Sequence, residues 1–299
     1  MTDKGIILSV NDVPEGKDVY NPAVLMLDNK LVVWGREESR ATPTDATVRT
    51  FWLPQNPGTT LEPLADAYIF RGENGWTQED PCAAIIQGQL VIGVVEVEWS
   101  PTGKTEWMGH KLKSFRMRFY AGSDWRHLEP FAEGPLGMKD IRLVDLGKDG
   151  IGVYARPKPD IGFTVIPSLN ALTPEVITEA PALPIPHDED EWIGTNAVYR
   201  TSEETNLLLL HSGRYDAQGN LDYRAEWLFH NFATGEVSER YVLAVRSDFP
   251  DGPAKKPELA NVIFPSALIW NDNETVDFYT GCSDAAIGRN TYPASLFAA

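Results

Sequence analysis

The chain has 299 residues, 42% of them hydrophobic, which is enough for one large core or two small ones. Its formal net charge of −17 repels nucleic acids and anionic membranes, so neither is an expected partner. No apolar run is long enough for a signal sequence or a bilayer span, and two cysteines are too few for a disulfide framework, so we expect a cytoplasmic protein.

Short apolar runs bounded by turn residues follow one another along the whole chain, which indicates strands, and no long amphipathic helix is visible. The pattern recurs as a polar cluster, a strand, a turn and a second strand. In chain order, these units begin at Asn21, Asp80, Lys139, Gly194 and Phe264. Tight-turn signals join the two strands in four of the units, at Asp28–Lys30, Gln87–Gln89, Gly147–Gly150 and Asn271–Asn273.

Five such units predict an all-β fold, a five-bladed β-propeller formed by one domain over residues 1–299. The unit starts are 55 to 70 residues apart, whereas blades of roughly 40–50 residues are usual, so these blades carry extra loops. The proline-rich stretch 174–186 is predicted to be a loop between blades. A β-sandwich is the alternative, but its turn signals would recur every 8–12 residues without the longer period.

The polar clusters at the unit starts are candidates for chemistry, because the first strand of each blade lies nearest the propeller axis. In Glu79-Asp80-Pro81, a carboxylic acid whose pKa is raised by burial could protonate a leaving oxygen. The same tripeptide is also common as a turn cap before a strand. The sequence alone leaves both interpretations open.

Basic groups occupy equivalent positions in the units. Arg36, Lys139, Arg156 and His211 start or end the inner hairpins, and together they would form an anion site. Arginine offers a planar fork that matches phosphate, and lysine offers a point charge. Alternatively, each pairs with one of the many carboxylates. Asp140, Asn196 and Asp284 could bind sugar hydroxyls or cap turns. The run from His187 to Glu191 is contiguous and lacks a ligand geometry, so we expect no metal.

At these motifs the chain resembles known enzymes. The order of Arg36-Glu37, Glu79-Asp80-Pro81, Lys139-Asp140, Ala155-Arg156-Pro157, His211-Ser212-Gly213 and Gly281-Cys282-Ser283-Asp284 is similar to that of glycoside hydrolase family 130. That family holds mannoside phosphorylases and some mannosidases on a five-bladed propeller. Segments 137–144, 161–163, 191–194 and 246–259 resemble a sister group long known only as a domain of unknown function. The sister group is related to the mannosyltransferase/phosphorylases of glycosyltransferase family 108, which act on β-1,2-mannan.

The resemblance, which runs from about Tyr20 to about Asn290, implies an inverting transfer of mannose between a β-mannoside and phosphate. The partners would be a mannose-containing oligosaccharide and phosphate or mannose 1-phosphate, and no cofactor is expected beyond phosphate as co-substrate. Asp80 matches the proton donor, and Lys139, Arg156 and His211 match phosphate-binding positions. The expected substrate-binding residues are Asn21, Arg36, Glu37, Glu79, Asp140, Asn196 and Asp284.

One position departs from the family pattern. Family 130 phosphorylases commonly have arginine directly after Glu-Asp-Pro, and this chain has Cys82. Arg142 or the loop with Lys255 and Lys256 are candidates for the missing charge. Two other functions stay open. A hydrolase on the same fold would use Glu37, Glu79 or Glu96 as the base that activates water. A catalytically silent propeller would only bind sugars.

Overall fold

The computed structural model describes residues 4–54, 58–70, 72, 75–100, 105–107, 109–157 and 159–298. Within this part the chain forms twenty strands, a single α-helix of five residues and six short 3-10 turns. The all-β prediction is therefore confirmed. None of the helices in these ranges has the length and apolar character that crossing a bilayer requires.

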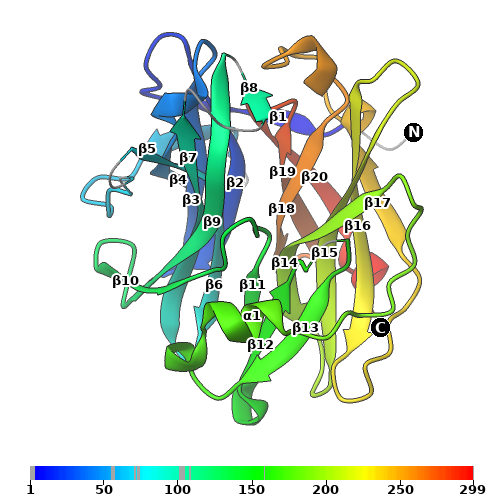
Figure 1. Cartoon of the computed structure of the whole chain (residues 1–299). Coiled ribbons are helices and arrows are strands. Elements are labelled where there is room, and N and C mark those ends of the chain that lie inside the picture. The colour runs from blue at the N-terminus through cyan, green and yellow to red at the C-terminus, as the bar shows by residue number, and fades with distance from the viewer. Residues whose placement is uncertain are drawn as a thin grey trace.

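The strands form four hydrogen-bonded sheets, which we divide into five groups that follow one another along the chain (Figure 1). The first contains β2 (Lys17–Leu27), β3 (Lys30–Ser39), β4 (Thr47–Leu53) and β5 (Thr60–Pro63). The second contains β6 (Trp76–Ile86), β7 (Gln89–Ser100), β8 (Thr105–Trp107), β9 (His110–Gly122) and β10 (Leu128–Glu133). The third contains β11 (Arg142–Asp145), β12 (Ile151–Ala155) and β13 (Gly162–Ile166). The fourth contains β14 (Trp192–Arg200), β15 (Thr205–Tyr215), β16 (Leu221–Asn231) and β17 (Tyr241–Val245). The fifth contains β18 (Ile263–Trp270), β19 (Thr275–Cys282), β20 (Ala286–Pro293) and β1 (Ile6–Val10).

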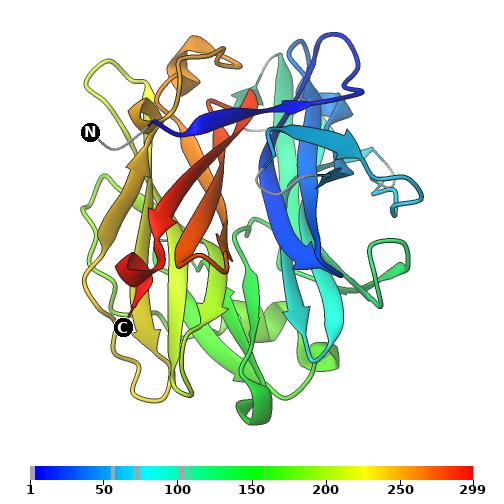
Figure 2. The same ribbon diagram turned by 180° about the vertical axis from the view of Figure 1, so that it is seen from behind.

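Both ends of the chain contribute to the fifth group. Strand β1 pairs antiparallel with β20 and parallel with β5, so the fifth and first groups join into one eight-stranded sheet (Figure 2). The first strands of the groups contact each other in a ring, β2 to β6, β6 to β11, β11 to β14, β14 to β18 and β18 to β2. The starts of these strands are therefore brought together around a common axis.

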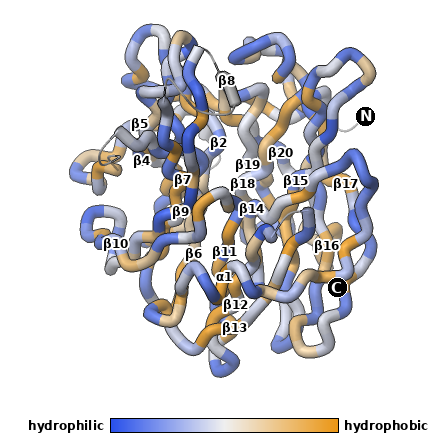
Figure 3. The backbone as a smooth tube through the Cα atoms, in the orientation of Figure 1, coloured by the Kyte–Doolittle hydropathy of each residue, from blue (hydrophilic) through white to orange (hydrophobic). Residues whose placement is uncertain are grey.

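Apolar side chains fill the spaces between neighbouring groups. The four consecutive leucines of strand β15 illustrate this packing. Leu207 and Leu209 pack with residues of the fifth group, and Leu208 and Leu210 pack with residues of the third. Successive side chains of a strand point to opposite faces, so a strand buried on both faces needs a continuous apolar run. Along the chain, hydrophobic residues concentrate on the strands and polar residues on the connecting loops (Figure 3).

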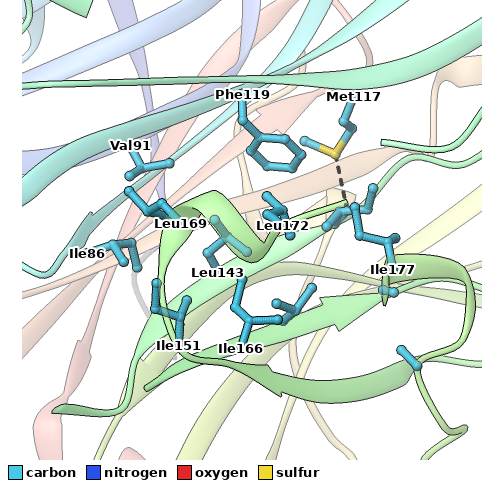
Figure 4. Packing of buried hydrophobic residues seen from close by; sticks show 14 of the residues in the cluster. Ile86, Val91, Met117, Phe119, Leu143, Ile151, Ile166, Leu169, Leu172 and Ile177 are labelled. Carbon is cyan, nitrogen blue, oxygen red and sulfur yellow. Dashed lines mark hydrogen bonds between the residues drawn. The ribbon is translucent and has the colours of Figure 1, made fainter. Parts of the chain in front are cut away.

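The third group has three strands, and the segment that follows it covers its outer side. The prediction of a loop over residues 174–186 is wrong at its start, where α1 (Pro174–Thr178) forms. The Thr173 side chain caps this helix by accepting a hydrogen bond from the Val176 amide, and Pro174 suits the first turn. Ile177 lies in the cluster between the second and third groups (Figure 4). The 3-10 turns are η1 (Pro43–Asp45), η2 (Gly147–Asp149), η3 (Leu169–Ala171), η4 (Arg246–Asp248), η5 (Pro257–Leu259) and η6 (Ala294–Phe297).

A β-bulge interrupts the first strand of four groups near its start. The register shifts lie between Tyr20 and Ala23, Glu79 and Cys82, Thr195 and Ala197, and Pro265 and Ala267. Bulges turn side chains out of the regular alternation and are frequent beside active sites. Asn21, Asp80 and Asn196, which belong to three of the repeated polar clusters, lie in these bulges.

Candidate active site

A cavity of about 180 Å³ lies where the predicted site residues meet. Eight of the predicted side chains line it: Asn21, Arg36, Glu79, Asp80, Lys139, Arg156, His211 and Asp284. The other lining residues are Leu221, Tyr223, Leu259, Val262 and Phe264. Contributions come from all five strand groups or the segments between them, so residues remote in sequence share one pocket.

Three polar residues near the unit starts have an unusual backbone conformation. Asn21, Asp80 and Asp140 have φ angles of 45°, 42° and 62°, in the left-handed region. Asparagine and aspartate enter this region more readily than other side chains, because their short polar groups can bond locally. At Asn21 and Asp80 the sequence therefore combines the conformation that a bulge requires with a polar side chain at the cavity.

One side of the cavity is a carboxylate pole, formed by Glu79, Asp80 and Asp284 around Arg36. Asn21 Nδ2 donates to Asp80 Oδ1 at 2.9 Å, and Arg36 Nη1 lies 3.2 Å from the same oxygen. Burial would raise the pKa of Asp80, but Arg36, Lys139 and the hydrogen bonds outweigh it and lower that pKa. Asp80 is therefore ionised at neutral pH.

Glu79 differs from Asp80 although the two are adjacent. Its Oε2 lies 3.0 Å from the same Arg36 Nη1, so the two carboxylates share one donor. Burial raises the pKa of Glu79 to about 7, with Arg36 opposing the shift and Asp80 adding to it. Its Oε1 is buried without a hydrogen-bond partner among the described residues. Burial also raises the pKa of Asp284, and Asp80 adds to that shift.

A buried layer behind the carboxylate pole fixes Arg36. Its Nη2 lies 2.6 Å from Glu38 Oε2, and Lys255 Nζ lies 2.6 Å from Glu38 Oε1. Tyr20 donates to Glu38, and the Arg36 guanidinium lies 5.1 Å from the centre of the Tyr20 ring. Neither Glu38 nor Tyr20 was among the residues predicted for the site. The alternation of β3 would have placed Glu38 on the same face as Arg36.

Glu37 lies outside the cavity, on the other face of β3. Its carboxylate lies 2.6 Å from Arg49 Nη1 and 3.6 Å from Lys17 Nζ. Arg36 and Glu37 are neighbours in a strand, so they point to opposite faces. Glu37, which was predicted as a substrate-binding residue, thus forms its ion pairs outside the cavity.

Three further lining residues, Lys139, Arg156 and His211, form what we call the cationic pole of the cavity. Asp140 does not line the cavity. It accepts a hydrogen bond from Arg156 Nη1 and so orients the guanidinium. Lys139 forms no salt bridge within the described part of the chain. Burial lowers its pKa, but Asp140 and Asp80 outweigh burial and raise it, so Lys139 is charged. This pole offers its cations to a ligand.

His211 is held as a neutral ring. Its Nδ1 lies 2.7 Å from Asn196 Oδ1, and Asn196 itself does not line the cavity. With that oxygen as acceptor, Nδ1 carries the proton. Burial, reinforced by Arg156, lowers the pKa of His211 to about 3. Gly194 makes room for this ring, since a Cβ there would lie 2.4 Å from His211 Cε1.

The candidates for the charge missing at Cys82 do not line the cavity. Arg142 Nε donates to the Asn196 carbonyl at 2.6 Å, and Lys255 pairs with Glu38. Cys82 and Arg142 instead line a second, mainly apolar cavity of about 900 Å³. Glu96, the alternative base, lies 3.1 Å from Arg116 Nε and does not line the site either.

No group of three or more His, Cys, Asp or Glu side chains within the described ranges could hold a metal ion. Asn21 Oδ1, Glu79 Oε1 and Arg156 Nε belong to side chains that line the cavity, and these three atoms are buried without a partner among the described residues. Buried polar atoms normally have hydrogen bonds, so these side chains would gain contacts by turning toward a polar ligand. Carboxylates and cations across a small cavity suit a sugar next to an anion.

Residues 3–294 match the family described as proteins of unknown function, DUF1861. The chain belongs to the DUF1861 family. Two solved structures from Leishmania mexicana resemble this member at 26% identity. One is the mannose phosphorylase MPT-4 in complex with phosphate ion (TM-score 0.86, covering 100% of this chain and 91% of that chain). The other is the GDP-Man-dependent mannosyltransferase MPT-1 (TM-score 0.84, covering 98% and 90%).

A more distant likeness is to a structure from family GH130, described as mannoside phosphorylases that include hydrolases of β-1,2 mannosidic linkages in Candida mannan. Its TM-score is 0.66 at 17% identity, covering 93% of this chain and 85% of that chain, so it bears on the fold alone. No protein of curated function matches this DUF1861 member. The resemblance predicted from the sequence motifs is confirmed by these matches.

Proposed function

We propose that this DUF1861 protein transfers mannose, with inversion, between a β-mannoside and inorganic phosphate. The observation that carries the proposal is the pairing of a cationic pole and a carboxylate pole in one cavity of about 180 Å³. A similar protein, MPT-4, is a mannose phosphorylase in complex with phosphate, which supports an anion at the cationic pole. The sequence motifs resemble those of enzymes acting on β-1,2-mannan, so we propose this linkage for the substrate.

Phosphate would bind between Lys139, Arg156 and the neutral His211 ring. Arg156 and Lys139 supply positive charge, and the unprotonated His211 Nε2 can accept a hydrogen bond from a phosphate hydroxyl. Phosphate brings its own nucleophilic oxygen to the anomeric carbon. An inverting hydrolase needs a second carboxylate to activate water, and phosphorolysis does not.

Asp80 would deliver the proton to the leaving glycosidic oxygen, directly or through a sugar hydroxyl. Arg36 and Lys139 lower its pKa despite burial. A bound phosphate would offset the charge of Lys139 and, together with the sugar, exclude water. Both changes favour the protonated acid. Substrate binding would therefore prepare Asp80 for general-acid catalysis.

Mannose would lie between the two poles. Asn21 Nδ2 bonds Asp80 and lies 3.5 Å from Asp284 Oδ1, and the Asp284 carboxyl, which lines the cavity, would accept hydrogen bonds from sugar hydroxyls. Arg36 would keep Asp80 and Glu79 in place. Asp140 and Asn196 would act indirectly, by orienting Arg156 and His211.

We further propose that the five strand groups are the blades of a five-bladed β-propeller forming a single domain. This is supported by the ring of first-strand contacts and by five hydrophobic clusters, each between neighbouring groups. Closing the ring through β1 and β20 would protect the sheet edges.

The test is to incubate the protein with β-1,2-mannobiose in the presence and absence of inorganic phosphate and to separate the products. Mannose 1-phosphate that forms only with phosphate is the expected result. Free mannose formed at the same rate without phosphate would instead identify a hydrolase. Binding of the disaccharide without any product would identify a sugar-binding protein.

A further inference from the structure

A chain of aromatic rings leads from the cavity to the surface along one face of β14, β15 and β16. Tyr223 lines the cavity and lies parallel to the His211 ring, with centroids 5.6 Å apart and 3° between planes. Trp192 follows at 5.7 Å from Tyr223, and Tyr215 at 5.4 Å from Trp192. Tyr215 is 63% exposed. We name Tyr223, Trp192 and Tyr215 the aromatic ramp.

The backbone holds these rings on a common face. In the strand register Gly213 pairs with Trp192 on one side and with Tyr223 on the other. Trp192 Nε1 donates to the Tyr223 hydroxyl at 3.1 Å. A Cβ at Gly213 would lie 2.6 Å from Trp192 Nε1 and from Tyr223 Cε1, so only glycine leaves room for both rings. Tyr215 is two residues beyond Gly213 and so points to the same face.

We propose that the aromatic ramp binds further sugar units of the oligosaccharide whose terminal mannose occupies the cavity. A pyranose presents an apolar face of C–H groups that packs on an aromatic ring, while its hydroxyls stay in water. Tyrosine and tryptophan suit such a site because one end of the ring is apolar and the other polar. This proposal deepens the function proposed above and rests on it.

The tilts of the rings favour a sugar chain over a planar nucleobase. Trp192 makes angles of 70° with Tyr223 and 59° with Tyr215, so the ramp offers successive single faces and no parallel slot. The Trp192 N–H is already bonded to Tyr223 and is not free to read a base. Tyr215, at the outer end of the ramp, is exposed to solvent, so a longer sugar chain could continue past it.

The experiment is isothermal titration of wild type, Tyr215→Ala and Tyr215→Phe with β-1,2-mannooligosaccharides of two to five units, without phosphate. For wild type, affinity should rise with chain length. Tyr215→Ala should weaken binding of the longer chains by roughly two- to tenfold, in the range of one aromatic contact, and Tyr215→Phe should restore it. Tyr241→Ala, at a tyrosine 44% exposed on the outer strand β17, is the matched control and should bind as wild type.

Length-independent affinity in wild type, or equal affinities of wild type and Tyr215→Ala for every chain, would overturn the proposal. Competition by GDP that Tyr215→Ala relieves, without a change in oligosaccharide binding, would overturn it in favour of a nucleotide site. Because binding is measured without phosphate, the result is independent of phosphorolysis. Length-dependent binding that Tyr215→Ala weakens would support the ramp even if no mannose 1-phosphate were formed.

Discussion

Arg156 donates a hydrogen bond to Asp140 inside the protein, where only 7% and 2% of their side chains are exposed. The pair orients the guanidinium and leaves its Nε without a partner among the described residues. Removing either partner of a buried ion pair leaves an uncompensated charge in the interior, so each partner needs the other to stay in place. The cationic pole is thus a fixed structure rather than a set of mobile surface charges.

Arg156→Ala should raise the KM for phosphate by roughly 10- to 100-fold, because a charge-assisted hydrogen bond is lost. The KM for the mannoside should change much less. Initial rates at varied phosphate and varied mannobiose give both constants. Since Arg156→Ala leaves Asp140 buried and unpaired, the thermal stability of the variant must be measured together with its KM values. Equal increases in the two KM values would contradict a phosphate-specific contact.

Glu79 gives the expected pH dependence. Burial raises its pKa to about 7, so it is protonated below neutrality and ionises above it. An ionised Glu79 competes with Asp80 for Arg36 and adds negative charge to a cavity that must accept phosphate. We expect kcat/KM for phosphorolysis to fall as the pH rises through about 7. This fall in kcat/KM reports the titration of the coupled carboxyls of Glu79 and Asp80 together rather than of one residue.

Glu79→Gln keeps the contact with Arg36 but cannot ionise. The variant should therefore lose the fall in kcat/KM near pH 7. Asp124→Asn is a matched control, since Asp124 lies on an exposed turn with Arg126 and His127 and does not line the cavity. A Glu79→Gln profile that superimposes on wild type would assign the titration to another group.

Gly194→Ala tests the close packing of His211. The new Cβ would lie 2.4 Å from His211 Cε1 and 3.0 Å from Asp140 Oδ2, so the ring must move. We expect the KM for phosphate to rise by about tenfold or more, because a small misplacement of a positioning group is costly. Gly252→Ala is the control, since a Cβ there has no neighbour closer than 3.7 Å. If Gly194→Ala keeps the wild-type KM for phosphate, the assignment of His211 to the anion site would be contradicted.

Buried His230 should make the fold sensitive to acid. It is fully buried, its Nδ1 lies 2.7 Å from the Tyr154 hydroxyl, and burial lowers its pKa from 6.5 to about 4. Between these values the unfolded chain binds a proton that the folded protein does not. Stability should therefore fall as the pH drops from about 6.5 to about 4, by on the order of 3 kcal/mol from this group.

Urea unfolding at several pH values measures this loss. His230→Gln should flatten the dependence of the unfolding free energy on pH, although His211, whose pKa is also lowered, leaves part of it. His127→Gln, at an exposed histidine, should keep the wild-type dependence. An unchanged slope in His230→Gln would mean that His230 is already protonated or accessible in the folded state.

The repeating motifs made the strand groups and most of the candidate site predictable. Asn21 and Asp80 sit in equivalent bulges, so their equivalent places in the sequence become neighbouring places in the cavity. Alternation within a strand would also have separated Arg36 from Glu37. The contacts between different strand groups could not be predicted from the sequence. The pairing of Lys255 with Glu38 joins segments remote in sequence, and nothing local to either residue indicates it.

The two carboxyls of the Glu79-Asp80 pair show a second limit of sequence reasoning. The motif allows one of them to act as an acid and the family resemblance implies Asp80, but the protonation of both depends on neighbours from other strand groups. Arg36 and Lys139 lower the pKa of Asp80, and burial raises that of Glu79. These contributions come from three-dimensional surroundings that a local motif does not contain.

The most direct test of the account is the phosphorolysis rate of Asp80→Asn measured together with phosphate binding. Asparagine preserves the size of the side chain but cannot donate the proton to the glycosidic oxygen. The account predicts that kcat falls by about 10²- to 10⁴-fold while the Kd for phosphate stays within a few fold of wild type. A variant that forms mannose 1-phosphate at nearly the wild-type rate would contradict it and place the acid elsewhere.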